Sequence, residues 1–338
     1  MSDGNNILRV NGLKVHFDTG RAPGGGRRIV HAVDGVNFSV KKGTCFGIVG
    51  ESGSGKSTIA QAIMRLVPIT EGSVFLKNLQ ISGLQGESLR DARARFQMVF
   101  QDPFSSLNPR KKARAAIREP LDLLGIGDAK GRDEVAEEML TAVGLHRDAG
   151  RLFPHQFSGG QRQRLCIARA LASRPDLIVC DEPVSALDVA IQAQILNLLR
   201  KLQQDMGLSY VFISHDLAVV QYICDEVGVM YLGQFVERAP VGKLFAEAKH
   251  PYTWSLMAAA LSPEAERGAL AKRPLLGGEP PSPTNPPKGC RFAARCPFAT
   301  EKCKAEPPAL RDFGGGHRVA CHFAGELEPP IPELKSAA

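Results

Sequence analysis

The sequence lacks any long hydrophobic run and any recognisable export signal. Its longest apolar stretch, residues 254–261, is far shorter than the roughly 20 residues that a membrane-spanning helix needs. The first ten residues, MSDGNNILRV, contain neither the basic start nor the apolar core of a secretion signal. We therefore expect the chain to stay in the cytosol, where its eight cysteines would be buried thiols or metal ligands rather than disulfides.

The composition also lacks the biases of disordered or fibrous proteins. Of 338 residues, 43% are hydrophobic and 23% are charged, which is typical of a soluble globular chain with one large domain or two smaller ones. Lysine and arginine number 42 against 35 aspartates and glutamates, giving a formal net charge of +7. This mild excess suits an anionic ligand or an acidic surface without indicating nucleic acid.

Short apolar runs alternate with helical patterns along much of the chain. The runs cover residues 45–49, 96–100, 177–181 and 210–214, and each is bounded by glycine, proline, serine or a charged residue. Such runs are typical of strands buried in an α/β protein. Strands that alternate with helices predict a mostly parallel, doubly wound sheet. Residues 102–157 show helical patterns without a good strand, so we interpret them as a helical insertion.

Glycine and proline mark the segments outside this alternation. A glycine-rich patch at residues 20–26 interrupts the N-terminal strands and predicts a flexible hairpin tip. Residues 273–288, RPLLGGEPPSPTNPPK, predict an extended linker without regular structure. We therefore divide the chain into residues 1–240, with the helical insertion as a subdomain, and a C-terminal region of residues 241–338 that holds four of the eight cysteines.

The clearest chemical motif is a phosphate-binding loop. The segment GESGSGKS matches the pattern G-x-x-x-x-G-K-[ST] and lies between an apolar strand and a helical run, as the pattern requires. Its glycines allow backbone N–H groups to converge on phosphate oxygens at a helix N-terminus. Lys56 would reach the β- and γ-phosphates, and the Ser57 hydroxyl would bind Mg²⁺. The residues expected to bind nucleotide here are Gly50, Glu51, Ser52, Gly53, Ser54, Gly55, Lys56, Ser57 and Thr58.

A second motif is a pair of acids, Asp181 and Glu182, at the end of an apolar strand. A carboxylate at the carboxyl end of a parallel strand lies where open α/β sheets bind their ligands. Asp181 would hold Mg²⁺, largely through water, and Glu182 would orient or deprotonate an attacking water. Taken alone the pair would indicate a solvated acidic turn, so the functional interpretation depends on the phosphate loop.

The segment Ser158, Gly159, Gly160 and Gln161 is a second potential anion site. Ser158 resembles a helix N-cap, and the two glycines leave backbone donors bare where a helical run begins. Two phosphate-binding devices on one domain cannot easily reach one nucleotide unless two copies of the domain face each other.

Together, these motifs resemble those of the ATP-binding subunit of an ABC transporter. By that resemblance, GESGSGKS is the Walker A motif, Ser158 to Gln161 is the signature motif, and Asp181 and Glu182 end the Walker B motif. The resemblance spans roughly residues 7–240. It implies an α/β fold of the P-loop NTPase type with N-terminal antiparallel strands.

The same resemblance implies roles for three further residues. Gln101 would be the Q-loop glutamine that senses Mg²⁺ and the γ-phosphate, His215 would be the switch histidine, and Phe17 would stack on adenine. The implied ligands are ATP and Mg²⁺. The implied catalytic residues are Lys56, Gln101, Glu182 and His215, and the implied metal-binding residues are Ser57, Gln101 and Asp181.

Finer features resemble the dipeptide, oligopeptide and nickel importers. These features are VFQDPFSSLNPR at residues 99–110, DEPVSALDV at 181–189, MYLG at 230–233, and the C-terminal run at 250–321. Two residues depart from the usual pattern. Phe157 replaces a leucine before the signature, and Phe17 replaces the commoner tyrosine, which keeps a stacking ring but loses a hydroxyl.

This resemblance also implies partners and a location. Two ATPase subunits, either homologous or identical, would enclose two ATP molecules between them. The helical insertion after Gln101, including residues 104–110, would be the dock for a cytoplasmic helix of a membrane permease. Two permease subunits would form the pathway, and an extracytoplasmic solute-binding protein would act indirectly. The chain would be peripheral, on the cytoplasmic face of the inner or plasma membrane, and would not bind nucleic acid.

Four cysteines, Cys290, Cys296, Cys303 and Cys321, lie close together in the proline-rich C-terminal region. So short a segment buries little apolar surface, and a cross-link would compensate. The four could bind Zn²⁺ or an iron–sulfur cluster, or stay reduced, and their spacing does not choose among these. The resemblance to the peptide importers implies a [4Fe-4S] cluster. The other four, Cys45, Cys166, Cys180 and Cys224, lie in apolar stretches typical of a core.

Two other classes of function were weighed. One is an ABC-type ATPase acting on DNA or ribosomes, but DNA-repair members carry long coiled coils and translation-linked members carry each motif twice, whereas here each motif occurs once. The other is an adenylate-type kinase, which would lack the segment from Ser158 to Gln161. The sequence therefore favours a subunit that powers peptide import, with nickel or another small solute as the alternative cargo.

Overall fold

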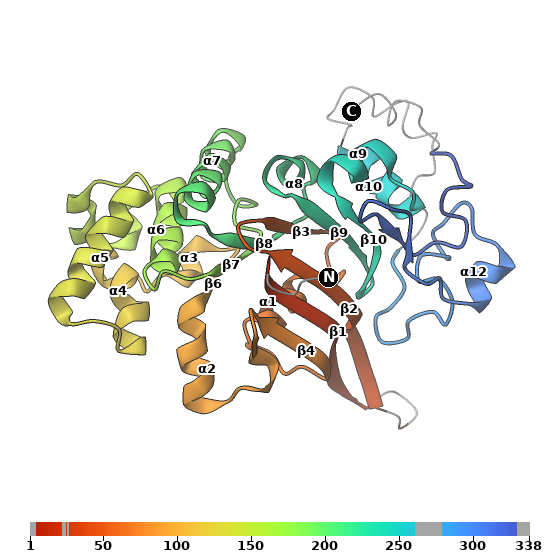
Figure 1. Cartoon of the computed structure of the whole chain (residues 1–338), viewed down its shortest axis with the longest axis horizontal. Helices are drawn as coiled ribbons and strands as arrows, with labels where there is room; N and C mark the ends of the chain where they lie inside the picture. Colours follow the sequence, from red (N-terminus) through yellow and green to blue (C-terminus); the bar gives the residue numbers. More distant parts are fainter. Residues whose placement is uncertain (1–4, 22–24, 26, 261–278, 330–338) are drawn as a thin grey trace.

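The computed structural model describes residues 5–21, 25, 27–260 and 279–329. These residues form two sheets (Figure 1). The larger has eight strands in the order β11-β12-β10-β9-β3-β8-β7-β6, and the smaller has four in the order β2-β1-β4-β5. The predicted α/β class with antiparallel N-terminal strands is confirmed.

The centre of the large sheet is parallel and completely buried. Strands β3 (Cys45–Val49), β8 (Ser209–Ser214), β7 (Leu177–Asp181), β6 (Phe96–Val99) and β9 (Glu226–Tyr231) pair in parallel. Every residue of β3, β7 and β8 is buried, because helices and the smaller sheet cover the two faces. The four strands predicted from apolar runs match β3, β6, β7 and β8 to within a residue.

The smaller sheet is built on one long hairpin. Strands β1 (Asn6–Arg21) and β2 (Arg27–Lys41) are antiparallel, and β4 (Glu71–Leu76) and β5 (Leu79–Gln80) extend the sheet beyond β1. The hairpin tip was predicted at residues 20–26, and β1 ends at Arg21 and β2 begins at Arg27. Residues 22–24 and 26 lie outside the described residues, and so does the predicted flexibility.

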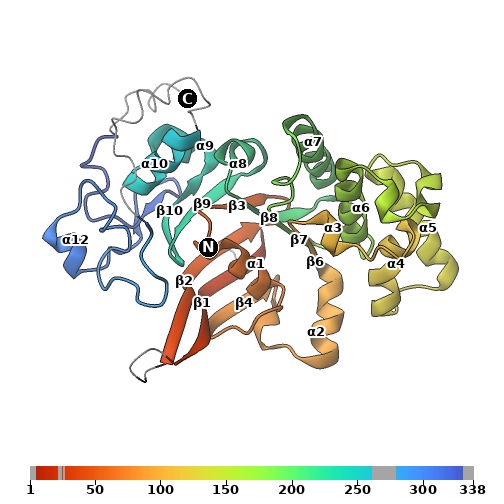
Figure 2. The same ribbon diagram turned by 180° about the vertical axis from the view of Figure 1, so that it is seen from behind.

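Helices cover the large sheet and form the insertion. Helices α7 to α10 lie on one face of the large sheet, and the smaller sheet lies on the other (Figures 1 and 2). The insertion is helical, as predicted, and lies at the end of the molecule opposite the C-terminal region. The helices are α1 (Lys56–Ile63), α2 (Gly86–Ala92), α3 (Pro103–Ser106), α4 (Ala113–Leu124), α5 (Ala129–Ala142), α6 (Gly159–Leu171), α7 (Val189–Met206), α8 (Leu217–Ile223), α9 (Val241–Glu247), α10 (Pro251–Ala260) and α12 (Glu301–Ala305).

The C-terminal region is joined to the large sheet by strand pairing. Strand β12 (Arg318–Val319) pairs with β10 (Gln234–Pro240), and β11 (Arg311–Asp312) pairs with β12. The predicted domain boundary at residue 240 stays a prediction, and backbone hydrogen bonds cross it. Residues 279–288 contain no helix or strand, as expected of a linker, while residues 273–278 lie outside the described residues.

A buried acid fixes this junction. Glu237 on β10 is fully buried, and its carboxylate accepts hydrogen bonds from the backbone N–H groups of Lys249 (2.7 Å) and His250 (3.0 Å). The Nε2 atom of His317, also fully buried, lies 2.7 Å from the same carboxylate. One side chain therefore holds β10, the turn before α10 and the segment before β12 together, and its buried oxygens are well satisfied.

Replacing Glu237 with alanine should destabilise the fold. We expect the free energy of unfolding to fall by about 3 kcal/mol, because two backbone N–H groups and one histidine would lose their buried partner. Urea denaturation of the purified chain measures this loss, with the exposed Glu247→Ala as the matched control. A loss as small as that of the control would contradict the role given to Glu237.

Candidate functional site

The phosphate loop joins β3 to α1 in a conformation that only glycine permits at two of its positions. Gly55 has φ +106°, and a Cβ atom there would lie 2.1 Å from the carbonyl oxygen of Ala32. A Cβ atom on Gly50 would lie 2.2 Å from the carbonyl oxygen of Met230. The loop therefore packs directly against the backbone of β2 and β9.

The loop curls around the ammonium group of Lys56. The Nζ atom donates hydrogen bonds to the carbonyl oxygens of Gly50 and Glu51, both at 2.8 Å. Burial lowers the pKa of Lys56 from its ordinary value, although the charges of Glu182, Asp181 and Glu51 oppose that shift. A positive charge is thus held at the centre of a ring of backbone groups.

A hydroxyl and a carboxylate meet beside this lysine. The Ser57 hydroxyl, at the start of α1, donates a 2.9 Å hydrogen bond to Oδ1 of Asp181, the last residue of β7. Burial raises the pKa of Asp181, and the hydrogen bond from Ser57 acts in the opposite direction. Oxygen ligands of this kind suit Mg²⁺. The predicted metal residues Ser57 and Asp181 are therefore adjacent.

Glu182 is the meeting point of three strand ends. Its Oε2 atom accepts a hydrogen bond from Nε2 of Gln101 (3.2 Å), which follows β6, and lies 3.1 Å from Nδ1 of His215, which follows β8. Its backbone has a φ of +46°, which non-glycine residues rarely adopt. Residues far apart in the sequence thus surround a single carboxylate, which is suited to accepting a proton from water.

A cavity of about 610 Å³ opens over these groups. Its lining includes six residues of the phosphate loop and α1, together with Gln101, Glu182 and His215. The remaining lining residues are Val30 and Ala32 of β2 and Pro283 of the C-terminal region. Phe17, which was predicted to stack on adenine, is half-buried and does not line the cavity. It pairs across the hairpin with Val30, which does line the cavity.

The segment from Ser158 to Gln161 lies elsewhere. It begins α6, where the Ser158 hydroxyl accepts from the N–H of Gln161 (3.4 Å) and Oε1 of Gln161 accepts from the N–H of Ser158 (3.0 Å). None of its residues lines the cavity. A Cβ atom on Gly160 would lie 2.5 Å from Ile191 of α7, and the adjacent Val189 is 82% exposed. This second anion device therefore opens on a surface that is separate from the cavity.

Two residues that contact the loop were not expected from the sequence. Both guanidinium nitrogens of Arg295 bind the carboxylate of Glu51, at 2.8 and 3.1 Å, and the N–H of Glu51 donates a 2.8 Å hydrogen bond to the hydroxyl of Tyr252. The Glu51 side chain is therefore directed to the C-terminal region, and Glu51 is not among the residues that line the cavity. The only feature of the sequence that could have indicated Arg295 was the presence of arginines between closely spaced cysteines.

The four C-terminal cysteines influence one another's pKa, and their role as metal ligands stays a prediction. All eight cysteines lie in the described ranges as free thiols, and Cys45, Cys166, Cys180 and Cys224 are buried, as expected. Burial raises the pKa of Cys290 and of Cys296 to about 11, and the neighbouring thiols add to both shifts. The backbone N–H groups of Phe292, Phe298 and Phe323 act to lower the pKa of Cys290, Cys296 and Cys321, respectively, against the larger effect of burial.

The spacing of these thiols is wider than a single ion needs. Within the described residues, only His16, His31 and Asp34 bring three potential ligand atoms within 4.8 Å of one another. Arg291 already donates to the carboxylate of Asp34, so a cation there would face a guanidinium. Sulfur ligands of one tetrahedral zinc would lie closer together than the four cysteines do.

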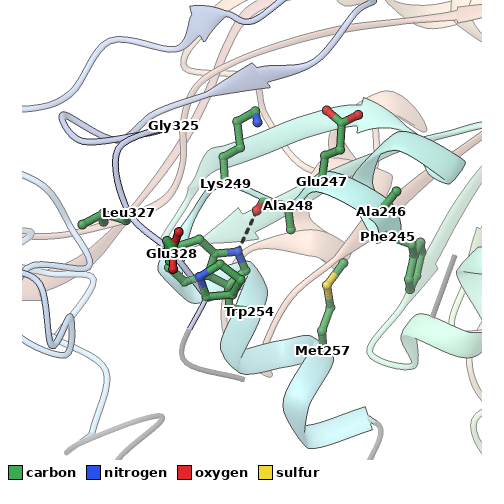
Figure 3. A pocket seen from close by; sticks show the side chains of 11 residues that line it. Phe245, Ala246, Glu247, Ala248, Lys249, Trp254, Met257, Gly325, Leu327 and Glu328 are labelled. Atoms are coloured by element: carbon green, nitrogen blue, oxygen red, sulfur yellow. Dashed lines mark hydrogen bonds between the residues drawn. The ribbon is translucent and has the colours of Figure 1, made fainter. Parts of the chain in front are cut away.

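A further pocket of about 480 Å³ lies between α9, α10 and residues 325–329 (Figure 3). The indole N–H of Trp254 donates a 2.7 Å hydrogen bond to the carbonyl oxygen of Ala248 at its edge. The pocket shares no lining residue with the cavity above the phosphate loop.

Among the helices that the structure describes, none has both the length and the apolar character needed to cross a membrane.

Comparison with known proteins gives consistent matches. The family described as "ABC transporter" matches residues 33–185, and the family described as "Oligopeptide/dipeptide transporter, C-terminal region" matches residues 236–303. The oligopeptide transport ATP-binding protein AppF of Bacillus subtilis is 51% identical over 295 residues, which cover 87% of this chain and 90% of AppF.

Solved structures agree with these matches. The ATP-binding cassette MJ0796, solved as a dimer in a post-hydrolysis state with ADP and Pi, is 30% identical with a TM-score of 0.61, over 70% of this chain and 99% of that one. CbiO1 from Clostridium perfringens, part of the ABC transporter complex CbiONQ, is 25% identical with a TM-score of 0.62, over 72% of this chain and 92% of that one.

The close packing of Gly55 leads to a test of the loop geometry. Gly55→Ala should lower the free energy of unfolding by about 2 kcal/mol more than Gly53→Ala, because overlap with the backbone of Ala32 adds to the strain of a positive φ. Gly53 has a φ of +76° but open space around it, so it controls for the φ strain alone. Chemical denaturation of both variants measures the difference, and equal losses would show that the predicted overlap is relieved.

Proposed function

Because the chain belongs to the ATP-binding subunits of ABC transporters, in their oligopeptide branch, we propose that it hydrolyses ATP to power the import of oligopeptides or dipeptides. The observation that carries this function is the meeting of Lys56, Ser57, Asp181 and Glu182 at one cavity. The relative AppF is named for oligopeptides rather than nickel. The match of the C-terminal region to that of peptide transporters favours transport over action on DNA or ribosomes.

The phosphates of ATP would lie in the loop around Lys56, whose ammonium group neutralises charge on the β- and γ-phosphates. Ser57, Asp181 and Gln101 would hold Mg²⁺, which adds further positive charge when bound. Val30, Ala32 and Phe17 lie on the hairpin at the side of the cavity where adenine would stack.

Glu182 would position and deprotonate the attacking water. Its side chain is only 15% exposed, and Gln101 and His215 both contact its Oε2 atom. His215 would also sense the γ-phosphate, since its ring lines the same cavity. In-line attack then needs little beyond orientation and charge neutralisation.

We further propose that the working unit is a head-to-tail dimer, with either an identical or a homologous second subunit. Ser158 to Gln161 begin a helix on a surface separate from the cavity, so their donors would complete the site of the other subunit. Gly160 of this segment lies against Ile191 of α7, whose first residue, Val189, is exposed, and the similar cassette MJ0796 was solved as a dimer. ATP would then hold the two subunits together until it is hydrolysed.

A groove of about 650 Å³ between the sheet core and the helical insertion is the proposed dock for a permease helix. Leu66, Phe100 and Leu123 in its lining are 51%, 40% and 64% exposed. Nearby, the guanidinium of Arg162 lies 4.1 Å from the ring centroid of Phe104, which connects this face to α6. Docking there would place the chain at the cytoplasmic face of the membrane, with a solute-binding protein acting through the permeases.

The four C-terminal cysteines are proposed to hold a [4Fe-4S] cluster, with Zn²⁺ as the alternative. Cys290, Cys296, Cys303 and Cys321 would be the ligands. The backbone N–H groups act to lower the pKa of three of the thiols, in the direction that ligation to a metal requires, and the wide spacing favours a cluster over one ion. Such a group would cross-link a region that has little core of its own.

Glu182→Gln tests the proposed ATPase mechanism. The variant should still bind ATP but hydrolyse it at least about 100-fold more slowly, because an amide cannot accept the proton from water. Phosphate release by the assembled transporter measures the rate, and Glu247→Gln, an exposed residue outside the cavity, is the control. Near-normal turnover by Glu182→Gln would contradict the role of Glu182.

Metal analysis tests the cysteine proposal. Protein purified without oxygen should be brown and contain iron and acid-labile sulfide, and Cys296→Ser should lose most of the iron. Cys166→Ser, at a buried position on α6, should keep it. Zinc in place of iron would identify the alternative, and the absence of both metals would overturn the proposal.

A further inference from the structure

The second residue of the phosphate loop is tied to the C-terminal region by a buried ion pair. Arg295 binds the Glu51 carboxylate through both terminal nitrogens, at 2.8 and 3.1 Å. The Arg295 side chain is 6% exposed and that of Glu51 is 26% exposed. Although burial acts to lower the pKa of Arg295, its hydrogen bonds with Glu51 and Tyr231 raise that pKa well above the ordinary value. A paired, largely dry guanidinium is a strong and directional partner for a carboxylate.

The same region reaches the loop at other points. The hydroxyl of the fully buried Tyr252 accepts the N–H of Glu51 at 2.8 Å, which fixes the backbone of the loop as well as its side chain. Residues 280–283 line a cavity of about 210 Å³ together with residues 51–54. The carbonyl oxygen of Pro283 also accepts the N–H of His31 on β2 at 3.0 Å.

We propose that Arg295 is a positioning residue for ATP, acting through Glu51, and that the C-terminal region is thereby a working part of the nucleotide site. This inference rests on the proposed function. Arg295 is not among the residues lining the cavity. Its effect on ATP comes through the shape and charge of the loop.

The charge of Glu51 is the reason why such a partner is needed. A carboxylate on a loop that binds a triphosphate repels the ligand, and the charge of Glu51 already influences Lys56. The bidentate pair neutralises that carboxylate and directs it away from the cavity. It also holds the carbonyl oxygen of Glu51 where Lys56 binds it in the structure without nucleotide.

Local geometry explains how Arg295 is held. The arginine immediately precedes Cys296, and its N–H donates a 2.9 Å hydrogen bond to the carbonyl oxygen of Phe292. The Phe292 ring is buried, with its centroid 5.3 Å from that of Tyr231 and 5.4 Å from that of Tyr252. The turn between Cys290 and Cys296 therefore carries Arg295 on a rigid aromatic base.

Removing the two charges of the pair one at a time separates positioning from simple packing. Binding of a fluorescent ATP analogue with Mg²⁺ is measured on the full chain, and the KM for ATP and kcat are measured on the assembled transporter. Arg295→Met should raise the Kd and the KM by about tenfold and change kcat much less, because an uncompensated carboxylate weakens binding of the phosphates. Arg295→Lys should recover part of this loss.

The decisive variant removes the exposed charge. In the Arg295→Met background, Glu51→Gln should recover most of the lost affinity, which loss of packing alone would not allow. Arg318→Met, an arginine in the same region that pairs only loosely with Asp312 at 3.7 Å, is the matched control and should bind as the unaltered chain does.

The outcomes distinguish this inference from the function on which it rests. Unaltered protein that neither binds nor hydrolyses ATP would overturn the proposed function. Normal ATP turnover together with an unchanged KM in Arg295→Met would overturn the positioning role alone. Failure of Glu51→Gln to restore affinity, or equal losses in Arg318→Met, would reduce Arg295 to a packing residue and also overturn the inference.

Discussion

The convergence of backbone groups around Lys56 is the constraint on which the rest of the site depends. The turn from β3 into α1 is closed by two glycines that lie against neighbouring backbone, and it leaves one ammonium group at its centre. The parallel strands at the centre of the large sheet bring the other residues together, because the carboxyl ends of these strands lie at the same edge. Asp181, Glu182 and His215 meet there without any local sequence signal to join them.

Much of this arrangement could be predicted from local sequence, and there is a physical reason why the rest could not. The sequences of buried parallel strands are unbroken apolar runs, so β3, β6, β7 and β8 could be predicted. The loop that follows β3 could be predicted from its motif. The contact between Arg295 and Glu51 was not, because it joins residues 244 positions apart and leaves no periodic pattern. The pairing of β12 with β10 was missed for the same reason, since a two-residue strand is too short to show alternation.

The helical insertion and α6 form one mechanical unit beside the sheet. Ser158 and Gln161 form a capping box at the start of α6, and the next residue, Arg162, stacks on Phe104. A displacement of the residues around the groove between the sheet core and the helical insertion would therefore shift the first turn of α6. In the proposed dimer, with a permease helix in the groove, this contact would couple the membrane partner to the nucleotide of the second subunit.

Strand β12 also covers the edge of the large sheet that β10 would otherwise expose. Without it, β10 would end the large sheet with a row of unpaired N–H and C=O groups, which is a ready template for another chain. The two short strands β12 and β11 cover that edge. His317, just before β12, gives the buried carboxylate of Glu237 on β10 a hydrogen-bonding partner. A truncated chain ending before residue 317 would thus be liable to aggregate even though every nucleotide motif would remain intact.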